Sequence, residues 1–164
     1  RDGLVGIHHS ENEHENIEKL LELNPDFVVH LCHATDEDLE KLKESNISVV
    51  VCPRSNDYFG NRPPLEKMIE IGLDLGFGTD NGMICSVNML DEIRFIDQNY
   101  SSIGKHKILE IACFGLNEMF NKDKASRYFN PKLSGWALLS REASDNYESV
   151  FSPKTTVLGA RWRN

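Results

Sequence analysis

The feature that most constrains this chain is an alternation of short apolar runs with stretches of helical spacing. One of these runs, ISVVVCP (47–53), is apolar at nearly every position, as expected of a parallel strand that is covered on both faces. Strands that alternate with helices predict a parallel sheet with helices packed on it, an α/β fold. The four predicted strands are LVGIHH (4–9), FVVHL (27–31), ISVVVCP (47–53) and LDLGFGTD (73–80).

Helical signals follow each predicted strand. Thr35 is a candidate N-cap, because three acidic residues suited to the positive end of the helix dipole follow it. Pro63 and Pro64 are expected to begin a helix, and Gly72 to end it. A polar loop is expected between the third strand and this helix, over residues 54–62. The predicted helices cover residues 15–23, 35–45, 63–72, 87–97 and 101–121.

The pattern changes in the last thirty residues. WALLS (136–140) and TTVLGARW (155–162) predict two short strands of a small appendage. We therefore expect residues 1–122 to form the α/β unit, with a β tail over 123–164. The chain opens on Arg1 and enters a strand-like run within a few residues, so we expect a fragment of a longer polypeptide.

Bulk properties exclude several classes of function. At 164 residues with 40% hydrophobic content, the chain is long enough for one core. Its net charge of −8 disfavours nucleic acid and anionic membrane surfaces. No apolar run approaches the roughly 18 residues of a membrane span. The four cysteines are widely spaced singletons, which indicates thiols in a reducing compartment, so we expect a cytoplasmic protein.

Polar residues stand where each predicted strand ends. His8 and His9 end the first strand, His30 lies in the second, and Asp80 ends the fourth. The carboxyl ends of parallel strands share one face, where ligands bind in both barrels and open sheets. A carboxylate beside a buried strand must be paired, hydrogen-bonded or bound to a cation. We therefore expect these side chains to surround a common ion.

Imidazole nitrogen and carboxylate oxygen are good ligands for zinc, and an open site of this kind activates water. Glu11, three residues after His8, is placed to move protons at the mouth of such a site. The spacing to Glu11 favours His8 over His9 as ligand, but leaves the choice open. A structural role remains an alternative for each histidine taken alone, and a cap or turn role for Asp80.

These residues resemble the metal-dependent amidohydrolase superfamily, in its branch of cytosine deaminases, S-adenosylhomocysteine deaminases and chlorohydrolases. The resemblance covers residues 4–97, through IHHSE, VVHLCHATDEDLEKL, VVVCPRSN, LDLGFGTDNG and NMLDEIR. It implies the carboxyl-terminal half of a (β/α)8 TIM-type barrel, comprising strands five to eight, followed by helices and a small β tail.

The resemblance also implies roles for individual residues. His8 and Asp80 would bind a divalent metal ion, zinc first, with iron or manganese as alternatives. Glu11 would be the proton shuttle, His30 would orient the water or polarise the substrate, and Asp80 would also act as base. The substrate-contact residues implied by the resemblance are Ser55, Asn56 and Glu92.

The chain departs from the family because the His-x-His pair of the first barrel strand has no counterpart in it. We therefore expect the missing amino-terminal half, or another copy in a homo-oligomer, to pair with the open sheet edges. The expected activity is deamination of a nucleobase-like or related heterocycle by metal-bound hydroxide. The alternative is a non-catalytic α/β module with a ligand-binding or structural role.

Overall fold

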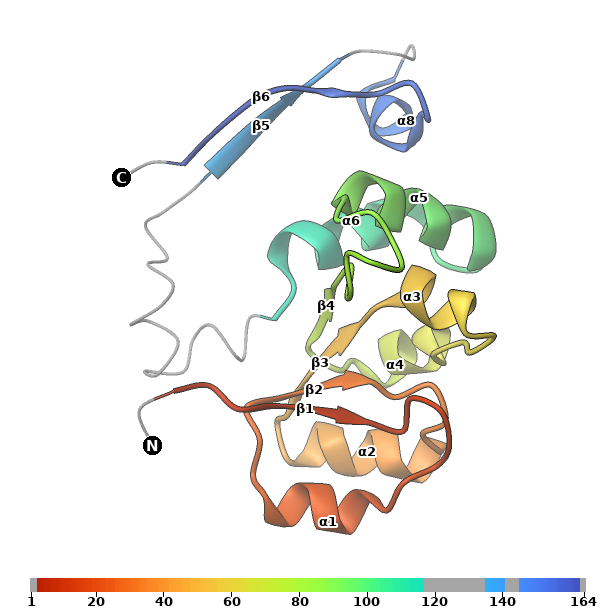
Figure 1. Cartoon of the computed structure of the whole chain (residues 1–164), viewed down its shortest axis with the longest axis vertical. Helices are drawn as coiled ribbons and strands as arrows, with labels where there is room; N and C mark the ends of the chain where they lie inside the picture. Colours follow the sequence, from red (N-terminus) through yellow and green to blue (C-terminus); the bar gives the residue numbers. More distant parts are fainter. Residues whose placement is uncertain (1–2, 117–134, 141–144, 163–164) are drawn as a thin grey trace.

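The computed structural model describes residues 3–116, 135–140 and 145–162, and its centre is a four-stranded parallel sheet (Figure 1). The strands are adjacent in the order in which they occur along the chain. Each strand is shorter than the run that predicted it. The strands are β1 (Gly6–His9), β2 (Phe27–His30), β3 (Ser48–Val51) and β4 (Leu75–Phe77). The predicted parallel α/β arrangement is confirmed.

Helices follow the strands largely as predicted. Thr35 caps the second helix with a full capping box, in which Thr35 and Asp38 each satisfy the other's backbone N–H. Gly72 ends α4 with φ of 75°, a left-handed conformation that glycine adopts without a side-chain clash. These helices are α1 (Ile17–Glu22), α2 (Asp36–Glu44), α4 (Leu65–Ile71), α5 (Met89–Asn99) and α6 (Lys105–Phe114).

The core lies between the helices and one face of the sheet. Val28, Val49 and Leu75 are register partners on that face, and all three are buried. The apolar faces of the helices cover them, through residues such as Leu39 and Met68. Because side chains alternate along a strand, the opposite face carries the register partners His8, Val29, Val50 and Gly76. His8 is exposed on that face and Val50 is partly exposed.

The prediction of a polar loop over residues 54–62 is wrong for its first half, which belongs to a short helix, α3 (Pro53–Tyr58). Pro53 suits the first helical position, since its missing N–H has no partner to lose there. Cys52, the N-cap residue, makes no side-chain capping bond. Instead Arg54 N–H donates to the Glu92 carboxylate of α5, 2.9 Å away. A distant residue therefore stabilises this helix, and periodicity could not reveal it.

The predicted helix over 101–121 is only partly correct. α6 ends at Phe114, and Leu116 has φ of 63°, outside helical geometry. Leu116 N–H donates to Leu75 O at the edge of β4, 3.1 Å away. Gly115 allows this approach, because a Cβ there would meet the backbone oxygen of Leu75. Residues 117–121 of the prediction lie outside the described residues.

The two tail strands are confirmed and pair with each other rather than with the parallel sheet. β5 (Gly135–Leu139) and β6 (Val157–Trp162) are antiparallel, and α8 (Asn146–Phe151) lies between them in sequence. The tail contacts the α/β unit through α8, since buried Phe151 joins the core. Arg94 of α5 also donates to Thr155 O, 3.1 Å away. The expected boundary between residues 122 and 123 lies outside the described residues.

Among the helices that the structure describes, none combines the length and the apolar character needed to cross a lipid bilayer.

Candidate active site

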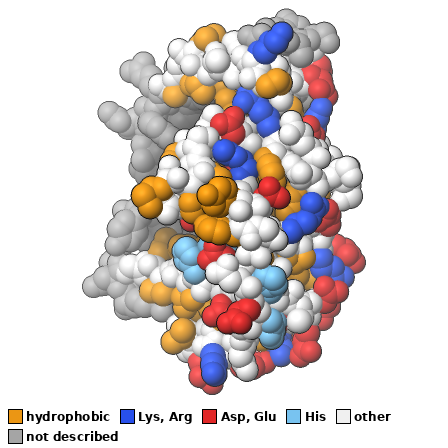
Figure 2. Space-filling model, turned by 45° about the vertical axis from the view of Figure 1, so that its right-hand side comes forward, with side chains coloured by type: hydrophobic (Ala, Val, Ile, Leu, Met, Phe, Trp, Pro, Cys, Tyr) orange, Lys and Arg blue, Asp and Glu red, His pale blue; other side chains and the backbone are white. Residues whose placement is uncertain are grey.

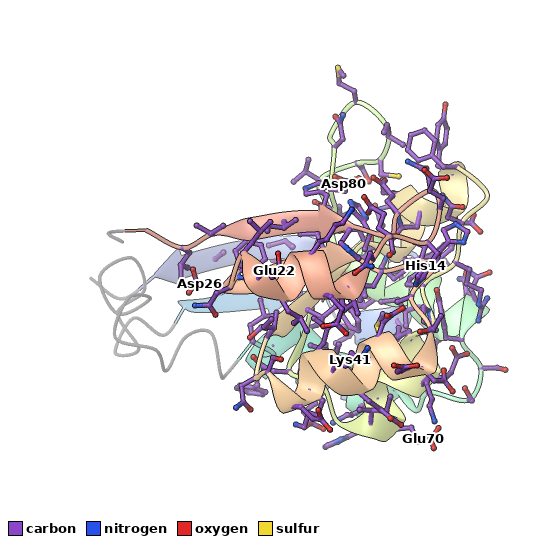
Figure 3. The ribbon with its side chains drawn as sticks, turned by 90° about the horizontal axis from the view of Figure 1, so that it is seen from below. His14, Glu22, Asp26, Lys41, Glu70 and Asp80 are labelled. Atoms are coloured by element: carbon purple, nitrogen blue, oxygen red, sulfur yellow. The ribbon has the colours of Figure 1, made fainter. Side chains whose placement is uncertain are left out.

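The polar residues predicted at the strand ends occur at the carboxyl-terminal edge of the parallel sheet. In Figure 3 the labelled Asp80 lies at the end of the sheet toward which β1 points, and Asp26, which precedes β2, lies at the opposite end. His8 is the last residue but one of β1, and His30 is the last residue of β2. The short helix α3 follows β3 directly, so its residues also begin at this edge.

His8, Glu11 and His30 form a compact group at this edge. His30 Nε2 lies 3.0 Å from His8 Nδ1 and 3.7 Å from Glu11 Oε1. The two imidazole rings meet edge to face, with centroids 4.7 Å apart. One potential ligand atom from each of the three residues lies within 4.8 Å of the others. Ligand atoms around a tetrahedral zinc ion lie about 3.3 Å apart, so atoms of this group would have to move closer together to bind one ion.

The backbone of His30 explains how its ring reaches His8. In the sheet register His30 pairs with His9, and an unbroken strand would place these two side chains on one face. His30 instead has φ of 78°, in the left-handed region that L-residues seldom adopt. This turn brings the ring toward His8, and the following Leu31 has φ of 57°.

His9 takes a different role from His8. Its side chain is buried, and its Nδ1 lies 3.0 Å from the Ser10 hydroxyl. His8 is exposed and belongs to the group with Glu11 and His30. A hollow on the surface is lined by both histidines and by acidic residues that include Glu11 and Glu15. Figure 2 shows histidine side chains beside acidic ones on one face of the molecule.

Asp80 lies at the same edge but outside this group of three. Its carboxylate accepts a hydrogen bond from the Ser55 hydroxyl, 2.5 Å away. Its backbone has φ of 55°, again left-handed. Burial raises the pKa of the Cys52 thiol to about 12, and the Asp80 and Glu92 carboxylates add to that rise. Cys52 is therefore an uncharged thiol at neutral pH.

The predicted substrate-contact residues are buried, and each makes a hydrogen bond, although Asn56 Oδ1 and Glu92 Oε2 have no hydrogen-bond partner among the described residues. Ser55, Asn56 and Glu92 each have no exposed surface. Asn56 Nδ2 lies 3.0 Å from His30 Nδ1, so α3 contacts the histidine on the side opposite His8. Burial raises the pKa of Glu92 to about 7, although the Arg54 backbone N–H and guanidinium oppose the rise. Their role as substrate contacts stays a prediction.

Sequence reasoning missed the bonds that join α3 to the other strand ends. No periodic signal marks α3, and the only hint was the adjacency of Ser55 and Asn56 after an apolar strand. It also missed the exposed apolar residues beside the site. Tyr58 and Phe59 end α3, and Met83 and Val87 lie in the loop after β4, each more than half exposed. Exposed apolar side chains in loops carry no pattern in the sequence.

Comparison with known proteins identifies relatives of this chain. The model of the "Amidohydrolase family" matches residues 4–114. An uncharacterised protein of Methanocaldococcus jannaschii is 39% identical over 112 residues, covering 61% of this chain and 30% of that protein. A 5-methylthioadenosine/S-adenosylhomocysteine deaminase of Caldanaerobacter subterraneus is 40% identical over 73 residues, covering 43% of this chain and 17% of that protein. The chain thus spans about a third or less of the curated relatives that it matches.

Solved structures show the same fold. An amidohydrolase from Brucella melitensis superposes with a TM-score of 0.71 at 16% identity, covering 98% of this chain and 43% of that chain. An adenosine deaminase from Xanthomonas campestris with bound zinc gives a TM-score of 0.59 at 18% identity, covering 74% of this chain and 32% of that chain. These neighbours support a partial TIM-barrel-like α/β fold.

Proposed function

Because this chain belongs to the amidohydrolase family, we propose that it is part of a metal-dependent hydrolase that cleaves carbon–nitrogen bonds. The observation that carries the proposal is the gathering of His8, Glu11 and His30 where parallel strands end. The proposed reaction is hydrolytic deamination of a nucleobase-like or related heterocycle. The name of the Caldanaerobacter relative, a deaminase of adenine-containing compounds, supports this class of reaction.

The proposed metal ligands of this chain are His8 and Asp80, for a divalent ion that is zinc, or alternatively iron or manganese. An imidazole nitrogen from His8 and a carboxylate oxygen from Asp80 have the donor chemistry that zinc prefers. The zinc-bound adenosine deaminase of the same fold supports the choice of ion. A bound divalent cation would supply Lewis acidity and a water molecule of lowered pKa.

Glu11 and His30 are proposed to handle protons and orient the reactants. The Glu11 carboxylate is partly exposed, so it can take a proton from water and deliver it to a leaving amine. His30 is held on both sides, by His8 and by Asn56, and its Nε2 faces the Glu11 carboxylate. From that position Nε2–H can donate a hydrogen bond to water or substrate. Asp80 is proposed as the base for the water.

We further propose that residues 1–122 are the carboxyl-terminal half of the barrel, its strands five to eight, and that 123–164 belong to a small β-domain. The edge of β1 that is unpaired among the described strands and the share of each relative that the chain matches support this assignment. The separate antiparallel pairing of β5 with β6 supports a distinct tail. The remaining half would come from another segment of the protein or from a second copy of the chain.

The test is to purify the full-length protein without chelator and to measure its metal content and its release of ammonia from aminated heterocycles. We expect about one divalent ion per site and ammonia from at least one compound. His8→Ala should lower both metal content and rate, the rate by about 100-fold or more. His33→Ala is the control, because His33 bonds to Asn61 outside the group. A full-length protein with neither metal nor activity contradicts the proposal.

A further inference from the structure

The short helix α3 is bonded to two residues of the proposed active site through adjacent side chains. Ser55 Oγ donates to Asp80 Oδ2 at 2.5 Å, and Asn56 Nδ2 lies 3.0 Å from His30 Nδ1. Both α3 side chains are wholly buried. Through these bonds each of the two side chains can fix the position of another residue of the site, while the buried Asn56 Oδ1 has no hydrogen-bond partner among the described residues.

The Asn56 contact determines which ring nitrogen of His30 carries the proton. With the amide in the orientation of the structure, Nδ2 donates to His30 Nδ1, which is then the unprotonated ring nitrogen. Neutral His30 then carries its proton on Nε2, the atom that faces His8 Nδ1 and Glu11. The opposite orientation of the amide would present Oδ1 to His30 and select the other tautomer. The two orientations therefore make opposite, measurable predictions.

α3 is itself held by a residue of α5. Cys52 supplies no side-chain cap, and the Arg54 N–H would otherwise be an unsatisfied donor at the start of the helix. Glu92 Oε1 accepts this N–H at 2.9 Å, and the Arg54 guanidinium lies 3.8 Å from Glu92 Oε2. Glu92 is fully buried, so its contact with α3 is shielded from water.

The two residues that α3 holds share an unusual backbone. His30 and Asp80 have φ of 78° and 55°, although neither is glycine. Such conformations persist only where surrounding contacts determine them, and they cluster at functional sites. The bonds from Asn56 and Ser55 are contacts of this kind.

We propose that α3 is the positioning element of the active site: Asn56 selects the Nε2–H tautomer of His30, Ser55 orients the Asp80 carboxylate, and Glu92 anchors α3. In this assignment the three residues position other groups of the site. The catalytic meaning of this assignment rests on the proposed function, but the geometry can be tested without activity.

The first experiment reads the His30 tautomer by NMR in the full-length, chelator-treated protein with ¹⁵N-labelled histidine. In the neutral ring we expect protonated Nε2 and unprotonated Nδ1. The His30 signals are assigned by their loss in His30→Gln. Asn56→Asp, whose carboxylate accepts from a protonated Nδ1, should move the proton to Nδ1. Wild-type His30 protonated on Nδ1 overturns the assignment to Asn56.

The control for that variant is Asn61→Asp. Asn61 also contacts a histidine, His33, at 3.1 Å, but the pair is exposed and outside the site. The Asn61→Asp variant should leave the His30 signals unchanged. A shift of the His30 proton in Asn61→Asp as large as that in Asn56→Asp would contradict a specific role for Asn56.

The second experiment compares zinc affinity in Ser55→Ala and Ser48→Ala. Ser48 is an equally buried serine that donates to an aspartate, Asp74, at 2.7 Å, but it lies at the start of β3. Removing a group that orients a metal ligand weakens metal affinity by about 10–100-fold. We expect that loss in Ser55→Ala and less than about a threefold change in Ser48→Ala. Equal affinities in the two variants overturn the role of Ser55.

A pair of Glu92 variants tests the anchor. Glu92→Gln keeps an oxygen that accepts from Arg54 N–H, so zinc affinity and the His30 tautomer should be retained. Glu92→Ala removes that acceptor and should weaken zinc affinity about tenfold in protein that remains folded by circular dichroism. Equal zinc affinity in the two variants contradicts the anchor. Wild-type protein that binds none of zinc, iron and manganese refutes the proposed function, whereas the tautomer measurement still decides the role of Asn56.

Discussion

At the scale of the residue, His30 has the most constrained position at the sheet edge. Its ring is buried between His8 and Asn56, and its backbone has left-handed φ. From the sequence, a core histidine and a functional one were equally good interpretations of His30. The contacts with His8 and Glu11 favour the functional interpretation, because a core histidine needs only one partner for each nitrogen.

Glu92 allows a prediction about stability and pH. Burial raises its pKa from 4.5 to about 7. The native carboxyl thus keeps its proton up to about pH 7, and the unfolded chain loses it near pH 4.5. Between these values the native state binds more protons, so the free energy of unfolding falls as pH rises. Glu92→Gln cannot ionise and should lack this decline.

The measurement is urea unfolding of wild type and Glu92→Gln at pH 5 and pH 8. The free energy of unfolding of the variant, relative to wild type, should rise by about 2 kcal/mol between the two pH values. Glu110→Gln, on the exposed face of α6, is the matched amide substitution. A relative stability of Glu92→Gln that is the same at both pH values would show that the native carboxyl is already ionised.

At the scale of the element, α3 and α2 show two ways of stabilising a helix. α2 carries its own signals, since Thr35 and Asp38 form a capping box three residues apart. α3 has no side-chain cap and depends on Glu92, 38 residues from Arg54. The sequence therefore predicted α2 with its cap and missed α3, because only the first is stabilised by neighbours in the chain.

The end of α4 gives a prediction for a single element. Gly72→Ala places a Cβ on a residue with φ of 75°, although nothing else lies within 4 Å. The loss should therefore come from the backbone alone, about 1 kcal/mol or more of the free energy of unfolding. Gly104→Ala is the control, since Gly104 also has open space around it but a φ of −67°. Chemical denaturation that gave equal losses for both would contradict this explanation.

At the scale of the whole molecule, helices cover one face of the sheet, and the other face is exposed in part among the described residues. The covered face holds the core, and the other face carries His8 with partly exposed Val50. β1 pairs only with β2 among the described strands, so one of its edges is unpaired there. Unpaired parallel edges tend to acquire partners, and a barrel removes them altogether.

The proposed barrel predicts the hydrogen exchange of β1. In the full-length protein, the backbone amides of β1 should exchange about as slowly as those of β2, because both strands would then have neighbours on each side. Mass spectrometry of peptides that cover residues 6–9 and 27–30 measures this. β1 amides that exchange as fast as exposed loops would argue against closure of the barrel on this edge.

The amino-acid sequence alone determined the order of strands and helices, the parallel sheet, the ends of most helices and the polar residues at the strand ends. These features depend on periodicity, capping and glycine or proline, which act over a few neighbouring residues. Only the tertiary structure decided that His8 rather than His9 joins Glu11 and His30, that α3 is a helix, and that its side chains hold His30 and Asp80. Those contacts join residues 22 to 38 positions apart, so they depend on how the units pack and turn, which no local pattern encodes.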